Sequence, residues 1–330
     1  ISRAAGKNYK FVTIINNVSD YKNLIKNLDK NKGATDINFR KKMAGKIFKI
    51  TNEYDKLVSI WLGDTNKPKN TYKLKYGENP SDKARLLSKN NKTIFDFQVS
   101  GKKIGYNNIL DIDSGYKCLS EFNEPTSVIV KHASPCGIAS SNDILKSFRN
   151  SLNSDNKSAF GGVVLLNRKV DKRLAKELSK YFFEIILAKC FDFEALKILT
   201  NKKNLILIEL DKFKLDTIES KSTIFGNLYQ KRKKYKINKS FIKHVSTIKA
   251  KSAHVNDLIF SLKVVKHLKS NAIVLTKNKQ TIGIGQGNTN RVDALKIAIK
   301  KMRENFNQKN FVCASDGFFP FVDSIKILKK

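Results

Sequence analysis

The amino-acid sequence predicts an α/β protein whose layered sheets are covered by helices on both faces. From about residue 125 onward, short runs rich in Val, Ile and Leu alternate with stretches of helical spacing, which is typical of that class. The chain has 330 residues and 41% of them are hydrophobic, so one large domain or two ordinary domains can form a packed interior. These numbers exclude a wholly disordered chain and a minimal disulfide scaffold.

The first hundred residues predict one strand, two helices and a linker. Phe11–Ile15 is a short β-rich run, and Asp20–Leu28 has helical spacing. Ile37–Leu62 predicts a long helix that is broken by polar residues near Thr51. Thr65–Thr71 is polar and contains a proline, which favours a linker.

Two ordered blocks follow, at about 125–210 and 255–330, and they are candidates for two similar α/β halves. The predicted strands are Thr126–Val130, Gly162–Leu166, Glu184–Ala188, Leu205–Leu210, Ala272–Thr276 and a short one near Ile282. The predicted helices are Asn142–Leu152, Asp171–Lys180, Val255–Lys266 and Val292–Asn305. Between the blocks, the Lys-rich stretch Asp211–Ala250 has weak periodicity and predicts loops.

The charge is strongly positive, with 64 Lys and Arg against 29 Asp and Glu, which gives +35. One interpretation is a nucleic-acid-binding protein, because dense positive charge releases counterions from a phosphate backbone. However, only 9 of the 64 basic residues are Arg, and the lysines are spread evenly along the chain. We therefore favour compositional drift in an AT-rich genome, with a general field that also attracts small anions.

Neither a membrane span nor a metal site is predicted. No apolar run approaches the ~18 to 20 residues that a spanning helix needs. The chain begins at Ile1 without a basic and then apolar leader, which predicts no signal peptide and suggests a sequence cut at its front. The cysteines and histidines do not come at zinc-ligand spacing, and the cysteines are far apart with no C-x-x-C pair, which favours a reducing cytoplasm. They are Cys118, Cys136, Cys190, Cys313, His132, His244, His254 and His267.

Five polar clusters come where strands are expected to end, which is where α/β proteins place their sites. They are Lys75–Pro80, Lys131–Gly137, Ser158–Gly162, Lys269–Arg291 and Ser315–Phe321.

Lys131 and His132 carry the most chemistry of these clusters. At neutral pH a histidine accepts a proton, and a neighbouring ammonium group stabilises a developing oxyanion. The pair therefore suits a reaction that deprotonates a weak nucleophile. The alternative is a capped turn whose histidine only hydrogen-bonds backbone.

Two further motifs have a functional and a structural interpretation. Gly283, Gly285 and Gly287 precede a predicted helix, so they fit a phosphate-binding loop or a tight turn, and the tight turn is favoured. The aromatic cluster Phe318–Phe321 fits either core packing or a surface that stacks on a heterocycle.

Taken in order, these clusters resemble a bifunctional purine-biosynthesis family, the AICAR transformylase/IMP cyclohydrolases. The resemblance covers nearly the whole chain, and Arg3–Asn8 looks like the closing part of the family's cyclohydrolase domain. The segments that carry it are Lys75–Pro80, Tyr106–Ile109, Val130–Gly137, Ser158–Gly162, Lys266–Ala272, Ile282–Gly285, Asn290–Val292 and Ser315–Phe321.

The resemblance implies a three-layer αβα fold with two cytidine-deaminase-like halves in the transformylase domain. That domain would cover residues 68–330, incomplete at its C-terminus, with halves at roughly 68–215 and 216–330. Residues 1–67 would be the C-terminal part of a Rossmann-like, methylglyoxal-synthase-like cyclohydrolase domain.

The implied activity is transfer of the formyl group of 10-formyltetrahydrofolate, a co-substrate, to the 5-amino group of AICAR, which gives FAICAR. His132 matches the family's base, and Lys131 matches the residue that stabilises the transition state or protonates the departing folate nitrogen. Asn271 matches the residue that orients the formyl oxygen or the amine. The intact protein is expected to act also as an IMP cyclohydrolase.

The resemblance also assigns binding residues and partners. A homodimer with shared active sites is implied, and a monovalent cation near Ser270 and Asp316 is known in some relatives. AICAR contacts would come from Lys75, Tyr76, Gly161, Glu184 and Phe318, folate contacts from Arg291, Phe319, Pro320 and Asp323, and Lys7 would be the catalytic lysine of the cyclohydrolase domain.

The sequence departs from the family pattern at several positions. Ser81-Asp82 stands where the family usually has His-Gln, Val322 replaces a common Arg, and Tyr9 replaces a His. The chain stops a few dozen residues before the family's end, and without its partners Lys7 is expected to perform no cyclisation. Two alternatives therefore stay open, an inactive remnant of the bifunctional enzyme and a basic nucleic-acid-binding protein.

Overall fold

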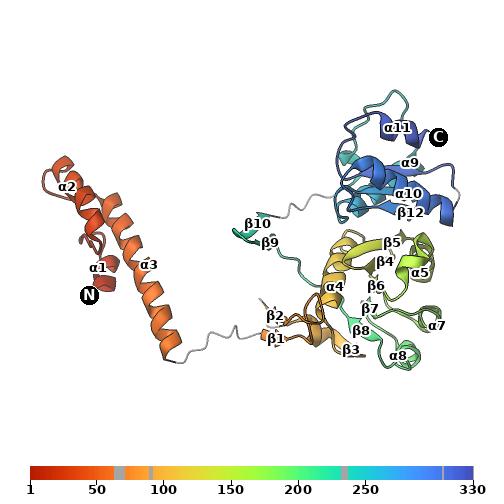
Figure 1. Cartoon of the computed structure of the whole chain (residues 1–330), viewed down its shortest axis with the longest axis horizontal. Coiled ribbons are helices and arrows are strands. Elements are labelled where there is room, and N and C mark those ends of the chain that lie inside the picture. The colour runs from red at the N-terminus through yellow and green to blue at the C-terminus, as the bar shows by residue number, and fades with distance from the viewer. Residues whose placement is uncertain (63–70, 89–91, 232–236, 307, 330) are drawn as a thin grey trace. The chain divides into compact units, whose positions relative to one another are not determined.

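The computed structural model describes residues 1–62, 71–88, 92–231, 237–306 and 308–329. The chain forms two compact units, Ile1–Thr71 and Tyr72–Lys330, which are described separately here (Figure 1). The predicted linker Thr65–Thr71 lies outside the described residues except for Thr71, which begins a strand.

The first unit is helical, with α1 (Ser2–Lys7), α2 (Tyr21–Lys30), α3 (Ile37–Trp61) and a short 3-10 turn, η1 (Val18–Asp20). The two predicted helices are confirmed. The Asp36 carboxylate accepts a hydrogen bond from the Phe39 amide at 2.8 Å and so caps the start of α3.

Two predictions in this unit are wrong. Phe11–Ile15 forms no strand, because residues 1–62 contain no strand with which it could pair. The backbone carbonyls of Tyr9 and Lys10 instead accept hydrogen bonds from Arg40, each at 3.0 Å. The helix α3 also continues without a break through Thr51, since polar residues on an exposed helix face do not interrupt backbone hydrogen bonds.

The second unit is built on a nine-stranded mixed sheet with the order β13-β11-β12-β5-β4-β6-β7-β8-β3. Every strand predicted beyond residue 125 is confirmed within a few residues at each end. The strands of this sheet are β3 (Gln98–Ser100), β4 (Thr126–Lys131), β5 (Ser134–Ser140), β6 (Val163–Leu166), β7 (Ile185–Ala188), β8 (Ile206–Glu209), β11 (Ile273–Lys277), β12 (Gln280–Gly285) and β13 (Val312–Ser315).

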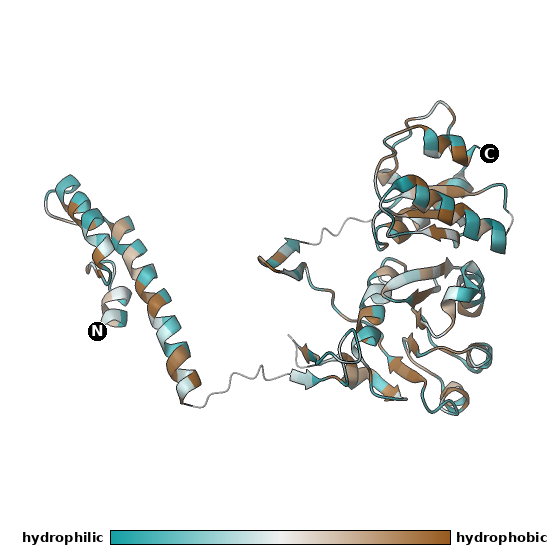
Figure 2. Cartoon of the chain, viewed as in Figure 1, coloured by the Kyte–Doolittle hydropathy of each residue, from teal (hydrophilic) through white to brown (hydrophobic). Residues whose placement is uncertain are grey.

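Helices cover both faces of the sheet, so the unit has three layers (Figure 1). Side chains alternate across each strand, and Val128 and Val130 face α4 and α9 while Ile129 faces the opposite layer. Figure 2 shows hydrophobic residues concentrated on the central strands. The helices are α4 (Tyr106–Leu119), α5 (Ile144–Ser154), α6 (Asn156–Ala159), α7 (Lys172–Leu178), α8 (Phe193–Leu199), α9 (Ser252–Val265), α10 (Arg291–Asn305) and α11 (Asp323–Leu328).

The same order of elements occurs twice along this unit. A helix, a β-hairpin and a second helix form α4-β4-β5-α5 and again α9-β11-β12-α10. The first helices of the two runs are 146 residues apart, as they begin at Tyr106 and Ser252 and end at Leu119 and Val265. In the sheet the two hairpins meet through β5 and β12, so the order β6-β4-β5 on one side mirrors β13-β11-β12 on the other.

Several segments differ from the sequence-based prediction. The stretch 211–250 contains an exposed hairpin, β9 (Ile218–Thr223) and β10 (Gly226–Lys231), and residues 134–137 belong to a strand rather than a loop. The remaining elements are β1 (Thr71–Lys73), β2 (Arg85–Leu87), η2 (Ile94–Phe97) and η3 (Lys239–Phe241).

Gly283 and Gly285 form neither a phosphate loop nor a turn, because both lie inside β12. A Cβ atom at Gly283 would lie 2.1 Å from the Ala298 carbonyl oxygen, and one at Gly285 would lie 1.9 Å from that of Ala294. The two glycines therefore allow α10 to pack closely against the strand.

Within the described ranges, no helix combines the length and the apolar composition that crossing a membrane would require.

We predict that Gly283→Ala lowers the free energy of unfolding by about 2 kcal/mol or more, because a strand and a helix backbone must separate to admit the methyl group. Urea unfolding measures the change. Gly105→Ala is the matched control in the same unit, since its Cβ would meet only the Asn108 side chain, at 3.4 Å. Equal stability of the two variants would contradict the packing account.

Candidate active site

The predicted site residues of the second unit gather along one edge of the sheet. Three strands end at this edge, β4, β12 and β13, and three begin there, β6, β7 and β11. The cross-strand partners Val130–Val163, Ile273–Gly285 and Ile273–Ser315 show this alignment. Lys131, His132, Gly161, Glu184 and Asn271 lie at or directly beside these strand ends. Segments far apart in the sequence therefore meet at one place.

His132 lies in the tight turn of the β4–β5 hairpin. It has φ 52° and Ala133 has φ 54°, so two consecutive non-glycine residues adopt the left-handed conformation, which costs roughly 1 to 2 kcal/mol each. The turn is held from α4, where the Asp111 carboxylate accepts a hydrogen bond from the Ala133 amide and the Ser114 hydroxyl donates one to the Ala133 carbonyl at 2.9 Å.

The histidine side chain itself stays exposed. Among the described residues no group hydrogen-bonds its imidazole, so the ring is not used to hold the turn. The alternative interpretation is a capped turn in which the histidine hydrogen-bonds backbone. The turn is capped, but Asp111 and Ser114 cap it, and His132 presents its ring to solvent.

Lys131 is fixed by two carbonyl oxygens. Its ammonium group donates to the Phe160 carbonyl at 3.0 Å and to the Gly161 carbonyl at 2.9 Å. Gly161 has φ 65°, and a Cβ atom there would lie 2.9 Å from Lys131 Nζ and 3.4 Å from the Phe182 ring. Only glycine satisfies both the backbone and the space at this position.

The same edge also holds two carboxylates, those of Asp111 and Glu184, and the Asn108 side-chain amide. The Glu184 carboxylate accepts hydrogen bonds from Asn108 at 3.1 Å and from Lys102 at 3.4 Å. Burial raises the pKa of Asp111, and Glu184 adds to the rise, while the Ala133 hydrogen bond and the charges of His132 and Lys131 lower it. The edge thus holds both signs of charge close together.

Asn271 reaches this edge from the start of β11. Its side-chain amide donates to the Asn288 carbonyl at 2.9 Å and to that of Thr289 at 3.2 Å. A neighbouring side chain, Gln286, donates to the Pro135 carbonyl at 3.0 Å and so connects the end of β12 to the β4–β5 hairpin. Two segments that carry predicted catalytic residues are therefore joined across the hairpins.

Arg291 and Asp316 form a nearly buried ion pair beside Asn271. The guanidinium group also donates to the Ser315 hydroxyl at 2.8 Å, and its side chain is 14% exposed. Burial raises the pKa of Asp316, but hydrogen bonds from Ser270, Arg291 and the Ala272 amide outweigh it and lower the pKa below its usual range. Arg291 thus holds the loops of this edge together, in addition to any contact with a ligand.

The aromatic cluster after β13 is mostly on the surface. Phe318 is 83% exposed and Phe321 is 72% exposed, so core packing is the wrong interpretation for both. Phe319 packs against the core under α10, Pro320 is exposed, and Asp323 begins α11.

Lys75 and Tyr76 are exposed after β1 and lie in contact with each other, with Lys75 Nζ 5.9 Å from the Tyr76 ring centre. The described structure shows no contact of either with Lys131 or His132. The same loop reaches the start of α4, where the Asn107 amide donates to the Glu78 carbonyl at 3.1 Å. Lys7 lies in the first unit.

Sequence reasoning gave no role to four side chains that organise this edge, although two of them lie in segments that it named. The four are Asn108, Asp111, Ser114 and Gln286. Asn108, Asp111 and Ser114 come at helical spacing of three residues, which was the available signal for one polar face of α4.

No three His, Cys, Asp or Glu side chains come together as a metal site in the part of the chain that the structure describes. The four cysteines are unpaired, and burial raises the pKa of Cys118 and of Cys136 to about 12.

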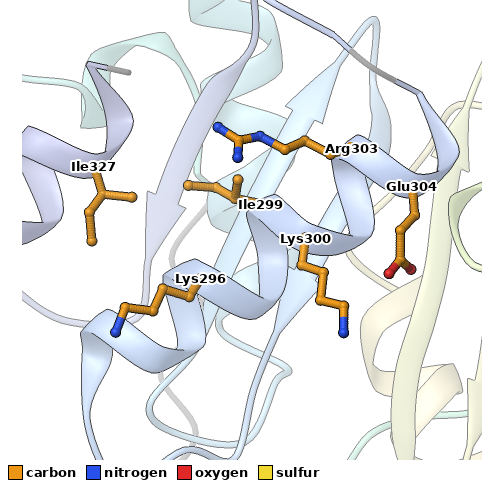
Figure 3. A pocket seen from close by; sticks show the side chains of 6 residues that line it. All are labelled: Lys296, Ile299, Lys300, Arg303, Glu304 and Ile327. Atoms are coloured by element: carbon orange, nitrogen blue, oxygen red, sulfur yellow. The ribbon is translucent and has the colours of Figure 1, made fainter.

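Two hollows of the second unit contain none of the predicted site residues. One, of about 940 Å³, lies between α4 and the β9–β10 hairpin and includes Tyr116 and Phe213. The other, of about 560 Å³, is an open groove between α10 and α11 (Figure 3). It is lined by Lys296, Ile299, Lys300, Arg303, Glu304 and Ile327.

A layered α/β unit with polar, charged loops gathered at one sheet edge belongs to the class of proteins that bind small molecules at strand ends. Comparison with known families gives the particular family. The model described as "AICARFT/IMPCHase bienzyme" matches residues 5–301, and the chain belongs to that family.

Similar proteins are found in several bacteria, each named bifunctional purine biosynthesis protein PurH. That of Caldicellulosiruptor saccharolyticus is 39% identical over 347 residues, which cover 99% of this chain and 67% of the relative. The Fusobacterium nucleatum protein is 39% identical over 342 residues, with 99% and 66% covered, and the Persephonella marina protein is 40% identical over 346 residues, with 98% and 66% covered. This chain thus spans about two thirds of the length of these relatives.

We predict that Asp316→Asn lowers the free energy of unfolding at pH 7 by about 2 kcal/mol or more, because it leaves Arg291 without its anion. Since the folded-state pKa of Asp316 is lowered, this stabilisation is present above the ordinary pKa of 3.8 and is lost as the pH falls through the folded-state value. Urea unfolding at pH 7 and below pH 4 measures it.

The control is Asp211→Asn, which removes an exposed ion pair with Lys189 at 3.0 Å and is expected to change stability by less than about 1 kcal/mol. A loss for Asp316→Asn that stays constant with pH would show that the charge is not the cause.

Proposed function

We propose that this chain catalyses formyl transfer from 10-formyltetrahydrofolate to the 5-amino group of AICAR, in the de novo synthesis of IMP. The observation that carries the proposal is the meeting of Lys131, His132 and the Asn271 segment at one sheet edge, although 139 positions separate His132 from Asn271. Family membership supplies the reaction class.

In the proposed reaction the exposed imidazole of His132 takes a proton from the amine. That amine is conjugated with an imidazole ring, so it is a poor nucleophile and needs a base. Its attack on the formyl carbon produces an oxyanion, and the carbon–nitrogen bond to the folate N10 then breaks as that nitrogen takes up a proton.

Lys131 is suited to stabilise that oxyanion or to supply the proton. An ammonium group has three N–H donors, and two of them go to Phe160 and Gly161, so one remains for a ligand among the described contacts. Because the backbone carbonyls fix its position, little reorganisation is needed when charge develops. Asn271, anchored through its own amide N–H groups, keeps its carboxamide oxygen for orienting the amine.

The substrate contacts proposed for AICAR are Lys75, Tyr76, Gly161, Glu184 and Phe318. The exposed Phe318 ring supplies a flat surface for a heterocycle, and Lys75 supplies positive charge for a phosphate. On the folate side we propose Arg291, Phe319, Pro320 and Asp323. Lys75 and Tyr76 would serve the site of a second copy, in a homodimer with shared active sites.

The same proposal covers the finer organisation of the chain. The two runs of helix, hairpin and helix would be the two cytidine-deaminase-like halves, and the first unit would be the end of the cyclohydrolase domain, with Lys7 as its catalytic lysine. A monovalent cation would lie near Ser270 and Asp316, and the setting would be the cytoplasm.

We predict that His132→Ala lowers the rate of FAICAR formation by about 100-fold or more, the amount typical of a lost general base. The assay follows tetrahydrofolate release from 10-formyltetrahydrofolate and AICAR. His244→Ala is the control, because it removes another exposed histidine that belongs to none of the predicted site segments.

Near-normal turnover in His132→Ala would remove His132 as the base. An unaltered chain that binds AICAR but forms no FAICAR would support an inactive remnant instead. An unaltered chain that binds duplex DNA or RNA at low salt, and neither substrate, would support the nucleic-acid alternative.

A further inference from the structure

A carboxylate of α4, Asp111, lies against the turn that carries His132. It accepts the Ala133 amide, and Ser114, one helical turn further along the same face, donates to the Ala133 carbonyl at 2.9 Å. Both polar groups of the residue after His132 are therefore held by one helix.

The second run of elements contains the same arrangement 146 residues later. Asp257 of α9 accepts the Asn278 amide at 2.9 Å and the Lys279 amide at 2.7 Å. Asn278 has φ 51° and Lys279 has φ 54°, so this turn has the same left-handed conformation as the turn at His132. In each of the two runs of elements, a carboxylate at this helix position thus hydrogen-bonds to the hairpin turn and holds it.

The two carboxylates differ in what else they face. Asp257 is buried and accepts both turn amides, whereas among the described residues Asp111 accepts only one. The charged groups around Asp111 are Lys131 and His132 on the hairpin and Glu184 before β7. One carboxylate is therefore purely structural, while the other also shares its charge with the predicted site.

We propose that Asp111 is a positioning residue for the reaction, which fixes the His132 turn through Ala133 and balances the charge of Lys131 and of the imidazolium that forms when His132 takes a proton. The inference rests on the proposed function. Asp111 needs no contact with either substrate for this role.

The arrangement costs stability. Because burial raises the pKa of Asp111, the favourable contribution of this group is present below its ordinary pKa of 3.8 and is lost as the pH rises through the folded-state value. At pH 7 the Asp111 carboxylate is therefore less well solvated in the folded protein than it would be in the unfolded chain. A merely structural residue would not need that charge, since an amide can also accept the Ala133 hydrogen bond.

The test compares Asp111→Asn with Asp257→Asn in the full chain. For Asp111→Asn we expect kcat for formyl transfer to fall about 10-fold or more with KM for AICAR changed less than about 3-fold, and the midpoint of thermal unfolding at pH 7 to stay equal or rise. For Asp257→Asn we expect the midpoint to fall and kcat to stay within about 3-fold. Unchanged kcat in Asp111→Asn, or a loss of kcat only together with the same loss of stability as in Asp257→Asn, would overturn the proposal.

A readout without turnover separates this inference from the proposed function. In the ¹⁵N-labelled chain the Ala133 amide signal should move with pH as Asp111 titrates, with a midpoint above 3.8, and this movement should vanish in Asp111→Asn but persist in Asp257→Asn. If the unaltered chain transfers no formyl group, the proposed function fails. The pH titration of the Ala133 signal still tests, without turnover, whether the Asp111 carboxylate holds the His132 turn. An Ala133 signal that does not titrate in the unaltered chain would overturn the placement of Asp111 on the turn, and with it the positioning role.

Discussion

The pairing of β5 with β12 is the contact on which the sheet edge depends. Only one residue pair, Ala139 and Gln280, is aligned in the ladder, but side chains extend the join. The Thr281 hydroxyl lies 3.0 Å from the Ile138 amide and 3.1 Å from its carbonyl oxygen, and Gln286 reaches the Pro135 carbonyl at the far end. Because the strands are antiparallel, this join brings the end of β12 and the start of β11 to the hairpin that carries Lys131 and His132.

Close packing and unusual backbone geometry are concentrated where this join requires them. Glycines inside β12 let α10 approach the strand, and a glycine at position 161 leaves room for the Lys131 ammonium group. Left-handed residues at both hairpin turns are held by hydrogen bonds to a carboxylate of the preceding helix. Pre-organisation of the edge is thus part of the fold, before any ligand is present.

The central strands could be predicted from the sequence because they are buried on both faces and therefore read as continuous apolar runs, as in Ile185–Ala188. Strands without that signature were missed. Ser134–Ser140 is buried along most of its length, but its sequence begins with Ser, Pro, Cys and Gly and so does not form an apolar run. The β9–β10 hairpin is almost wholly exposed, so its sequence shows no apolar pattern either. The glycines of β12 predict a turn, because sequence alone does not reveal that a helix backbone lies over them.

For the candidate site, polar clusters after strands were enough to predict that Lys131 and His132 lie at this sheet edge, since strand ends are where α/β proteins place their sites. The supporting residues could not be found in the same way, because Asp111 and Gln286 act through contacts with segments 22 and 151 positions away. The most direct test of the account is a double-mutant cycle of His132→Ala and Asn271→Ala on kcat/KM for formyl transfer. If the two residues act as one unit, the double variant should be about as slow as the slower single variant; if the two losses simply multiply, the residues act independently and the shared site at this sheet edge is contradicted.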